Sequence, residues 1–124
     1  MEFKDCRVLV TGGAGVIGQE LIQRLVSAGA QVICMDIKPR PSSFPKSVEY
    51  IQGDLSTTRP EDIATHNPEI LFHLAATFER TTETPEFSDD NFKNNIQLSH
   101  VVIKASGMSK NLKKFIFASS YLVY

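Results

Sequence analysis

Four of the seven glycines in this chain lie between positions 12 and 18, and this cluster constrains the fold more than any other feature. Gly13, Gly15 and Gly18 satisfy the spacing G-x-G-x-x-G, while Gly12, Gly15 and Gly18 satisfy the alternative G-x-x-G-x-x-G. The cluster follows a short apolar run and opens a stretch with helical periodicity, which is the context that gives such spacings meaning. Glycines let the backbone approach a ligand closely, and the free N–H groups of a helix start favour an anion. The cluster therefore predicts a pyrophosphate-binding loop rather than only a tight turn.

Short apolar runs alternate with helical segments along the rest of the chain. We expect strands at residues 6–10, 31–35, 48–52, 70–74 and 114–118, and helices at 16–28, 60–66 and 89–106. The helical spacing predicts one buried stripe in the first helix (Ile17, Leu21, Leu25, Ala28) and one in the last (Phe92, Ile96, Ser99, Ile103). Strands that are apolar on both faces and alternate with helices indicate an α/β fold. The expected fold is a doubly wound parallel sheet of about five strands in the order 3-2-1-4-5.

Length and composition limit the class of protein. The 124 residues fit one domain, residues 1–124, and the formal net charge of −1 gives no reason to expect nucleic acid or an anionic membrane surface as a partner. No apolar run approaches the roughly 20 residues of a membrane span, and the first five residues are too polar for a signal peptide. Cys6 and Cys34 both fall in expected buried strands without metal-ligand spacing, so we expect no metal site and a cytoplasmic location.

Asp36 ends the second expected strand, 18 residues after Gly18. An acid at this place accepts hydrogen bonds from the adenosine ribose hydroxyls and repels a 2′-phosphate. The sequence therefore favours NAD over NADP as the cofactor. Lys38 and Arg40 lie just beyond, and their positive charges act against that preference.

Five segments, in order, resemble motifs of one known family, the extended short-chain dehydrogenase/reductases, which include the NAD-dependent epimerases and dehydratases. Residues 11–18 resemble T-G-G-x-G-x-I-G, and residues 53–55 resemble G-D-[LIV]. His73-Leu74-Ala75-Ala76 resembles H-x-A-A, Asn95-Ile96 resembles N-[VI], and residues 119–124 resemble S-S-x-x-V-Y. The resemblance covers essentially the whole chain and implies a Rossmann-type fold.

The resemblance also implies roles for individual residues. Asp54 is expected to hydrogen-bond the adenine amino group, and Asn95 is expected to steady the backbone of the active site. Ser120 is expected to be the catalytic serine, whose hydroxyl would hydrogen-bond the reacting oxygen of the substrate. We treat His73 as structural. The expected cofactor-binding residues are Gly12, Gly15, Val16, Ile17, Gly18, Asp36, Asp54, Leu55, Leu74, Ala75, Ala76 and Asn95.

One element of the family pattern is missing, the Tyr-x-x-x-Lys pair that serves as general acid/base. Tyr50 is followed four residues later by Asp54, and Tyr121 and Tyr124 have no residue at that offset. We therefore expect an NAD-binding fragment, truncated before the sixth strand and the substrate domain and inactive by itself. By resemblance, the parent would be a homodimeric epimerase/dehydratase that acts on a small molecule, a nucleotide-linked sugar, by transient hydride transfer. A ketone or aldehyde reductase of the same superfamily, or a non-catalytic NAD-sensing or scaffold module, remains an alternative.

Overall fold

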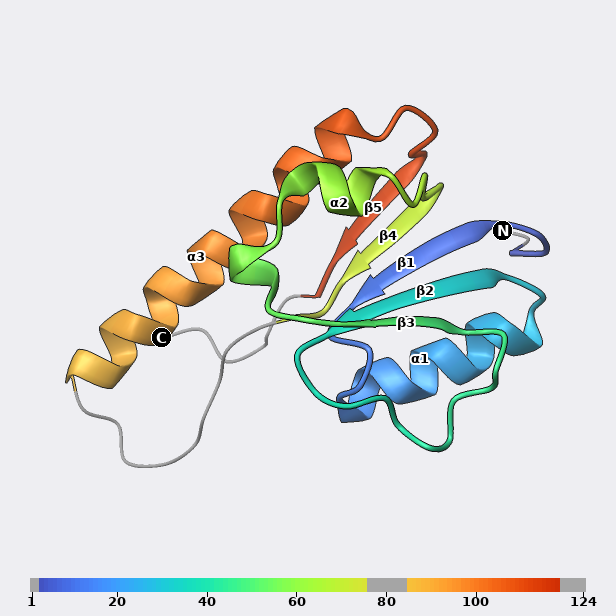
Figure 1. Cartoon of the computed structure of the whole chain (residues 1–124), viewed down its shortest axis with the longest axis horizontal. Helices are drawn as coiled ribbons and strands as arrows, with labels where there is room; N and C mark the ends of the chain where they lie inside the picture. The colour runs from blue at the N-terminus through green and yellow to red at the C-terminus, as the bar shows by residue number, and fades with distance from the viewer. Residues whose placement is uncertain (1–2, 76–84, 119–124) are drawn as a thin grey trace.

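The computed structural model describes residues 3–75 and 85–118. They form one five-stranded sheet in the order β3-β2-β1-β4-β5, with all pairings parallel (Figure 1). The α/β class and the strand order predicted from the sequence are confirmed. The elements in chain order are β1 (Arg7–Thr11), α1 (Val16–Ser27), β2 (Gln31–Asp36), β3 (Glu49–Gln52), the 3-10 turn η1 (Leu55–Thr57), α2 (Pro60–Ala64), β4 (Ile70–His73), α3 (Pro85–Met108) and β5 (Lys114–Phe117).

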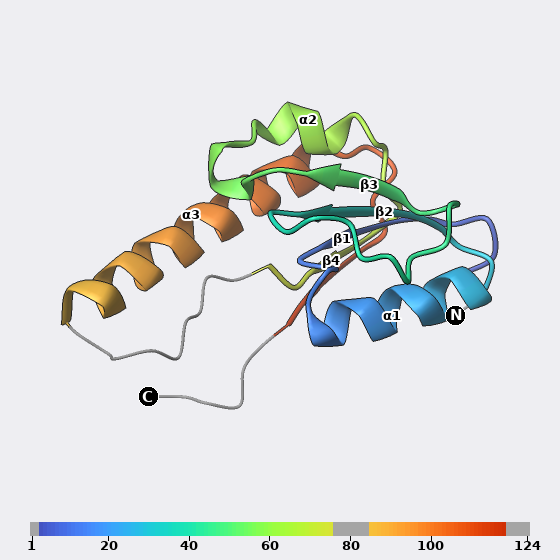
Figure 2. The same ribbon diagram turned by 60° about the horizontal axis from the view of Figure 1, so that its bottom comes forward.

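Helices cover both faces of the sheet, as the apolar character of its central strands requires. Viewed nearly along its edge, the sheet lies between α1 on one side and α2 with α3 on the other (Figure 2). Alternate residues of β1 serve the two cores: Val8 and Val10 face α1, whereas Leu9 faces α2 and α3. Because β1 is paired with β2 and with β4, its carboxyl end lies at the centre of the sheet.

The buried face of α1 agrees with the predicted stripe only in its middle, where Leu25 is buried and Leu21 packs against the core. Its buried residues are Gly18, Ile22 and Leu25, whereas Ile17 is 76% exposed and Ala28 is also exposed. The predicted stripe was therefore wrong at both ends. The physical reason is Gly18, which has no side chain and lies directly against the backbone of Gly12 and Gly13 in the glycine loop (residues 12–15). This contact turns the helix toward the sheet.

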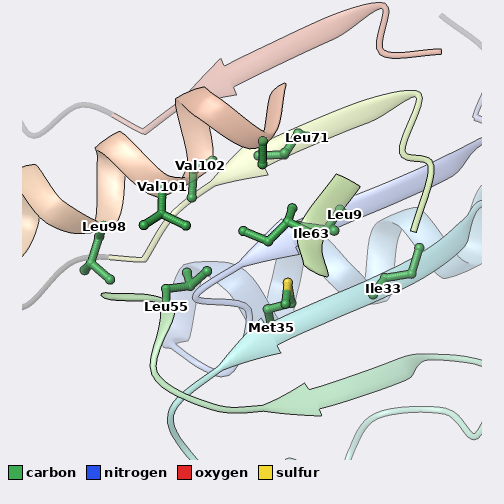
Figure 3. Close-up of a cluster of buried hydrophobic side chains, with 10 residues drawn as sticks. Leu9, Ile33, Met35, Leu55, Ile63, Leu71, Leu98, Val101 and Val102 are labelled. Carbon is green, nitrogen blue, oxygen red and sulfur yellow. The ribbon is translucent and has the colours of Figure 1, made fainter. Parts of the chain in front are cut away.

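The prediction for α3 was wrong at Ile96 and Ile103, whereas Ser99 is half-buried and the side chain of Phe92 lies outside what the structure describes. The helix buries Leu98, Val101, Val102 and Ala105, while Ile96 is 53% and Ile103 is 61% exposed. Figure 3 shows Leu98, Val101 and Val102 with side chains of β1, β2, η1, α2 and β4. Helical periodicity could not choose between the two apolar stripes, because both recur at helical spacing. Packing against η1 and α2, which are distant in the sequence, decides which one is buried.

Several boundaries also differ from the prediction. The helix α3 starts at Pro85 and ends at Met108, whereas the sequence predicted a helix at 89–106. The turn η1 was not predicted. Cys6 precedes β1 and is half-buried, so only Cys34 fits the expectation of a cysteine in a buried strand. Within the described residues, no helix is long and apolar enough to cross a membrane.

Candidate functional site: a cleft at the carboxyl ends of the central strands

A cleft of about 470 Å³ lies where the chain leaves β1, β2, β3 and β4. This is the point at which the strand order reverses direction, where ligands of open α/β sheets bind. Seven of the predicted site residues line it, together with five that were not predicted. The predicted ones are Gly12, Gly15, Asp36, Asp54, Leu55, Leu74 and Ala75, and the others are Ile37, Lys38, Gly53, Ser56 and Leu98.

The glycine loop is packed backbone against backbone. Gly12 has a φ of +72°, and a β carbon there would lie 2.6 Å from the backbone nitrogen of Ala75. A β carbon on Gly18 would lie 2.5 Å from Cα of Gly13 and 2.6 Å from the carbonyl oxygen of Gly12. The fold itself therefore requires glycine at positions 12 and 18.

Gly15 differs from these two glycines. It precedes the first residue of α1 in an extended conformation, with a φ of −75°. Among the described residues, a β carbon there would meet only the carbonyl oxygen of Gly12, at 3.6 Å, which is an ordinary van der Waals contact. The protein would tolerate alanine at this position, so the fold does not explain the glycine. A ligand that approaches the first turn of α1 would explain it, because Gly15 lines the cleft.

Asp36 joins the end of β2 to the glycine loop. The Ala14 N–H donates to Oδ2 of Asp36 at 2.9 Å, and the Lys38 N–H donates to Oδ1 at 2.9 Å. The residue is only 8% exposed, yet it lines the cleft. Each carboxylate oxygen accepts one of these bonds and keeps a further lone pair. Asp36 can therefore accept hydroxyl donors from a ligand while it braces the loop.

The two basic residues after Asp36 take different positions. Both terminal nitrogens of Arg40 donate to backbone carbonyls, Nη1 to Val48 at 2.7 Å and Nη2 to Pro45 at 2.6 Å. Arg40 therefore holds together the loop between β2 and β3, which contains Pro39, Pro41 and Pro45. It is not part of the cleft lining. Lys38 does line the cleft. Of the two cations expected to act against the Asp36 preference, the described structure brings only Lys38 to the site.

Asp54 follows β3, next to Gly53, whose N–H donates to the carbonyl oxygen of Asp36 at 2.9 Å, and it caps η1. Its Oδ1 accepts from the backbone N–H of Ser56 at 2.9 Å and from the Ser56 hydroxyl at 2.7 Å. The side chain is exposed at the cleft, so it can contact a ligand without loss of these bonds. The motif of Gly53, Asp54 and Leu55 therefore has a local structural reason besides its expected contact with adenine, since Leu55 is buried in the core.

Cys34 lies beneath the glycine loop and is fully buried. Burial, with the nearby Asp36 carboxylate, raises the pKa of its thiol to about 12. The thiol is therefore neutral and is a packing group rather than a nucleophile. Among the described residues, no group of three or more His, Cys, Asp or Glu side chains could hold a metal ion.

A buried polar contact ties β1 to β4 at the base of the cleft. The Thr11 hydroxyl lies 2.7 Å from Nδ1 of His73, and both residues are almost completely buried. Burial lowers the pKa of His73, so the imidazole is neutral at neutral pH. The structure agrees with the interpretation of His73 as a core residue and adds Thr11, which the sequence did not single out, as its partner.

The remaining predicted residues are outside the cleft lining or outside the described residues. Val16 and Ile17, in the first turn of α1, are 89% and 76% exposed. Asn95 is a half-buried residue of α3. Ala76 and Ser120 lie outside the described residues.

Of the five other cleft residues, Lys38 and Gly53 had been noted in the sequence beside Asp36 and Asp54 without being assigned to the site. Ile37 and Ser56 directly adjoin the predicted Asp36 and Leu55, which is a signal that could have found them. Leu98 carries no such signal, because only the packing of α3 brings it there.

Comparison with known proteins gives a consistent result. A model of the NAD dependent epimerase/dehydratase family matches residues 8–124. A 3-beta-hydroxysteroid dehydrogenase of Mycolicibacterium neoaurum is 31% identical over 119 residues, which cover 92% of this chain and 32% of the relative. A crystal structure of a UDP-galactose 4-epimerase has a TM-score of 0.77 and 30% identity over 95% of this chain and 39% of its own. A short-chain dehydrogenase of Leptospira borgpetersenii, solved with bound NAD+, has a TM-score of 0.66 and 28% identity over 87% of this chain and 46% of its own. The chain thus spans between about a third and a half of the length of these relatives.

Proposed function

Because this chain belongs to the NAD dependent epimerase/dehydratase family, we propose that its cleft binds NAD and that it forms the cofactor-binding part of an enzyme that transfers hydride. The observation that carries the proposal is Gly15. The fold leaves room for a β carbon at this position, on the side of the cleft where α1 begins, so the space there is suited to a ligand rather than to the protein. Backbone N–H groups at a helix start bind a pyrophosphate well.

The charges of the cleft favour NAD over NADP. Asp36 keeps lone pairs for the two ribose hydroxyls, and its negative charge opposes a 2′-phosphate. Arg40, which could have offset that charge, is engaged by the carbonyl oxygens of Val48 and Pro45. Lys38 is the remaining cation at this end of the cleft lining and would give NADP a weaker, residual affinity.

When bound, NAD would supply the hydride acceptor and donor. The residues of this chain would hold its pyrophosphate at Gly12 and Gly15, its ribose at Asp36 and its adenine near Asp54 and Leu55. Val16, Ile17, Ala76 and Asn95 are further cofactor contacts that the family resemblance implies. Ser120 follows the end of β5 by three residues. We propose that its hydroxyl hydrogen-bonds the reacting oxygen of the substrate.

For the substrate we propose a nucleotide-linked sugar that is oxidised and reduced again at one carbon. The structural likeness to a UDP-galactose 4-epimerase supports this class. The second candidate is a simple alcohol dehydrogenation, which the 31% identity to a 3-beta-hydroxysteroid dehydrogenase favours. The two differ in the fate of the hydride. An epimerase returns it to the substrate, whereas a dehydrogenase accumulates NADH, which absorbance measures directly.

Titration calorimetry of this chain with NAD and with NADP tests the cofactor proposal. We expect saturable binding of both, with NAD tighter. Asp36→Asn keeps one acceptor for the glycine loop but removes the charge. Because the bonds lost are charge-assisted, this change should weaken NAD binding by about tenfold or more. It should also reduce the ratio of the affinity for NAD to the affinity for NADP.

The ratio is an internal control, since any disturbance of the loop acts on both cofactors. Glu49→Gln, which neutralises an exposed acid of β3 outside the cleft, should leave the ratio unchanged. Absence of saturable binding of either dinucleotide would refute the cofactor proposal. An unchanged ratio in Asp36→Asn would refute the role of Asp36.

A further inference from the structure

The Thr11 hydroxyl lies among three polar groups of the β4 end. Besides the 2.7 Å contact with Nδ1 of His73, the backbone N–H groups of Leu74 and Ala75 donate to Thr11 Oγ1 at 3.1 and 3.2 Å. The Leu74 N–H is shared, because it also donates to the Thr11 carbonyl at 3.0 Å. The fully buried side chain of Thr11 thus accepts hydrogen bonds from the backbone of Leu74 and Ala75, which form one wall of the cleft.

The chemistry of the Thr11 hydroxyl determines which group donates in each hydrogen bond of this cluster. A threonine hydroxyl has one proton to donate and two lone pairs to accept. The two backbone N–H groups can only donate, so they use the two lone pairs. The hydroxyl proton must then go to His73, and Nδ1 must be the unprotonated acceptor.

From this arrangement we infer that Thr11 and His73 form a positioning pair for the cleft, one that requires the imidazole tautomer with its proton on Nε2. His73 orients the Thr11 hydroxyl, and the hydroxyl holds the Leu74–Ala75 backbone. Neither residue is proposed to touch the substrate. The effect on cofactor affinity rests on the proposed function, whereas the tautomer and the backbone hydrogen bonds do not.

The other side of the ring is consistent with this tautomer. Nε2 of His73 lies 3.4 Å from the Ser99 hydroxyl of α3, whose oxygen can accept a hydrogen bond from the Nε2–H group. The rings of Phe115 and Phe117 on β5 lie 6.5 and 5.6 Å from the imidazole, centroid to centroid. None of these neighbours carries a charge, so nothing in this set stabilises a protonated imidazole. The pair therefore links β1, β4 and α3 through neutral hydrogen bonds.

The position of Ala75 explains why the Thr11–His73 pair affects a ligand in the cleft. The Gly12 backbone and the Ala75 backbone are in such close contact that a β carbon on Gly12 would lie 2.6 Å from the Ala75 nitrogen. Gly12, Leu74 and Ala75 all line the cleft. If the Ala75 N–H loses its acceptor, the wall shifts relative to the glycine loop, and the cofactor meets a different surface.

Two measurements on the ligand-free chain test the pair directly. The ¹⁵N chemical shifts of the His73 ring should show protonation on Nε2 and a lone pair on Nδ1 at neutral pH. Hydrogen exchange at the Ala75 amide should be protected in the wild type, about tenfold or more faster in Thr11→Val, and protected again in Thr11→Ser, which restores the hydroxyl. Thr65→Val, which removes an exposed hydroxyl that donates to Asp62, is the control and should not alter the Ala75 amide.

A proton on Nδ1, or an Ala75 amide that exchanges equally in the wild type and in Thr11→Val, would overturn the inference. If Thr11→Val does not fold, the wild-type tautomer and the Thr11→Ser exchange still decide it. With NAD as the probe, Thr11→Val should bind about tenfold more weakly, and Thr11→Ser close to the wild type. If the wild type binds no dinucleotide, the proposed function is refuted. The tautomer and the hydrogen exchange still test the Thr11–His73 pair, because both are measured without a ligand.

Discussion

Replacing Gly15 with alanine is expected to weaken NAD binding while leaving the stability of the fold nearly unchanged. The added β carbon meets the Gly12 carbonyl oxygen at 3.6 Å and no closer atom of residues 3–75 and 85–118, and a φ of −75° suits any residue. Alanine is a poorer helix N-cap than glycine by a few tenths of a kcal/mol or more. It also restricts the unfolded chain, which stabilises by about 0.4–1 kcal/mol. These effects oppose each other, so the free energy of unfolding should change by less than about 0.5 kcal/mol.

The effect on binding should be much larger. The new methyl group would occupy the side of the cleft at the start of α1 and push a pyrophosphate away from the backbone N–H groups there. Loss of one hydrogen bond to a charged group costs about 1.5–3 kcal/mol, which corresponds to roughly ten- to hundredfold weaker binding. Titration calorimetry gives the affinity, and urea unfolding followed by circular dichroism gives the stability.

Two further glycines provide controls for this experiment. A β carbon on Gly107, in α3, meets nothing within 4 Å, so Gly107→Ala should stabilise by about 0.5–1 kcal/mol and leave the affinity unchanged. A β carbon on Gly18 would lie 2.5 Å from Gly13 Cα, so Gly18→Ala should destabilise by about 1–3 kcal/mol. If Gly15→Ala binds NAD as tightly as the wild type, or destabilises as Gly18→Ala does, the assignment of Gly15 to the ligand is refuted.

Two other predictions concern stability and association. Burial lowers the pKa of His73 in the folded state below its usual value of 6.5. As the pH falls below 6.5, the unfolded chain therefore binds a proton that the folded chain does not, so stability should be full above that pH and decrease as the pH is lowered further. His73→Phe should remove this part of the slope in urea unfolding at several pH values, and an equal slope in both proteins would contradict the pKa shift. On β5, at the edge of the sheet, Ile116 is 39% and Phe117 is 56% exposed, so we expect self-association that rises with concentration in sedimentation and is reduced by Phe117→Lys; a wild type that stays monomeric at high concentration would argue against it.

The parts that the sequence predicted well depend on short-range rules. The strand, glycine loop and helix around residues 7–27 follow from local turn chemistry and periodicity, and so does the place of Asp36 at the end of β2. The right-handed crossover between parallel strands and the order of the elements along the chain are then enough to predict the strand order 3-2-1-4-5. The motif around Asp54 was found by its resemblance to a family motif, and the structure adds that this acid also caps η1 through the N–H of Ser56.

The parts that were predicted wrongly or missed depend on contacts between distant segments. The helix α3 has apolar residues on two sides, and only its packing on η1 and α2 shows that Leu98 and Val102 are buried while Ile96 and Ile103 are exposed. In α1, the lack of a side chain at Gly18 lets the helix rest on the loop, which shifts the buried face away from Ile17.

By itself, the sequence determined a parallel α/β sheet with a glycine loop at the end of its first strand and an acid at the end of its second, because these features are encoded within a few residues of one another. It also carried the motifs of the family to which the chain belongs. The tertiary structure alone decided that Arg40 turns to its own loop while Lys38 stays at the cleft. It alone paired Thr11 with His73, 62 residues apart. Such pairings are set by how the strands align and which groups become buried, and no local pattern in the chain records them.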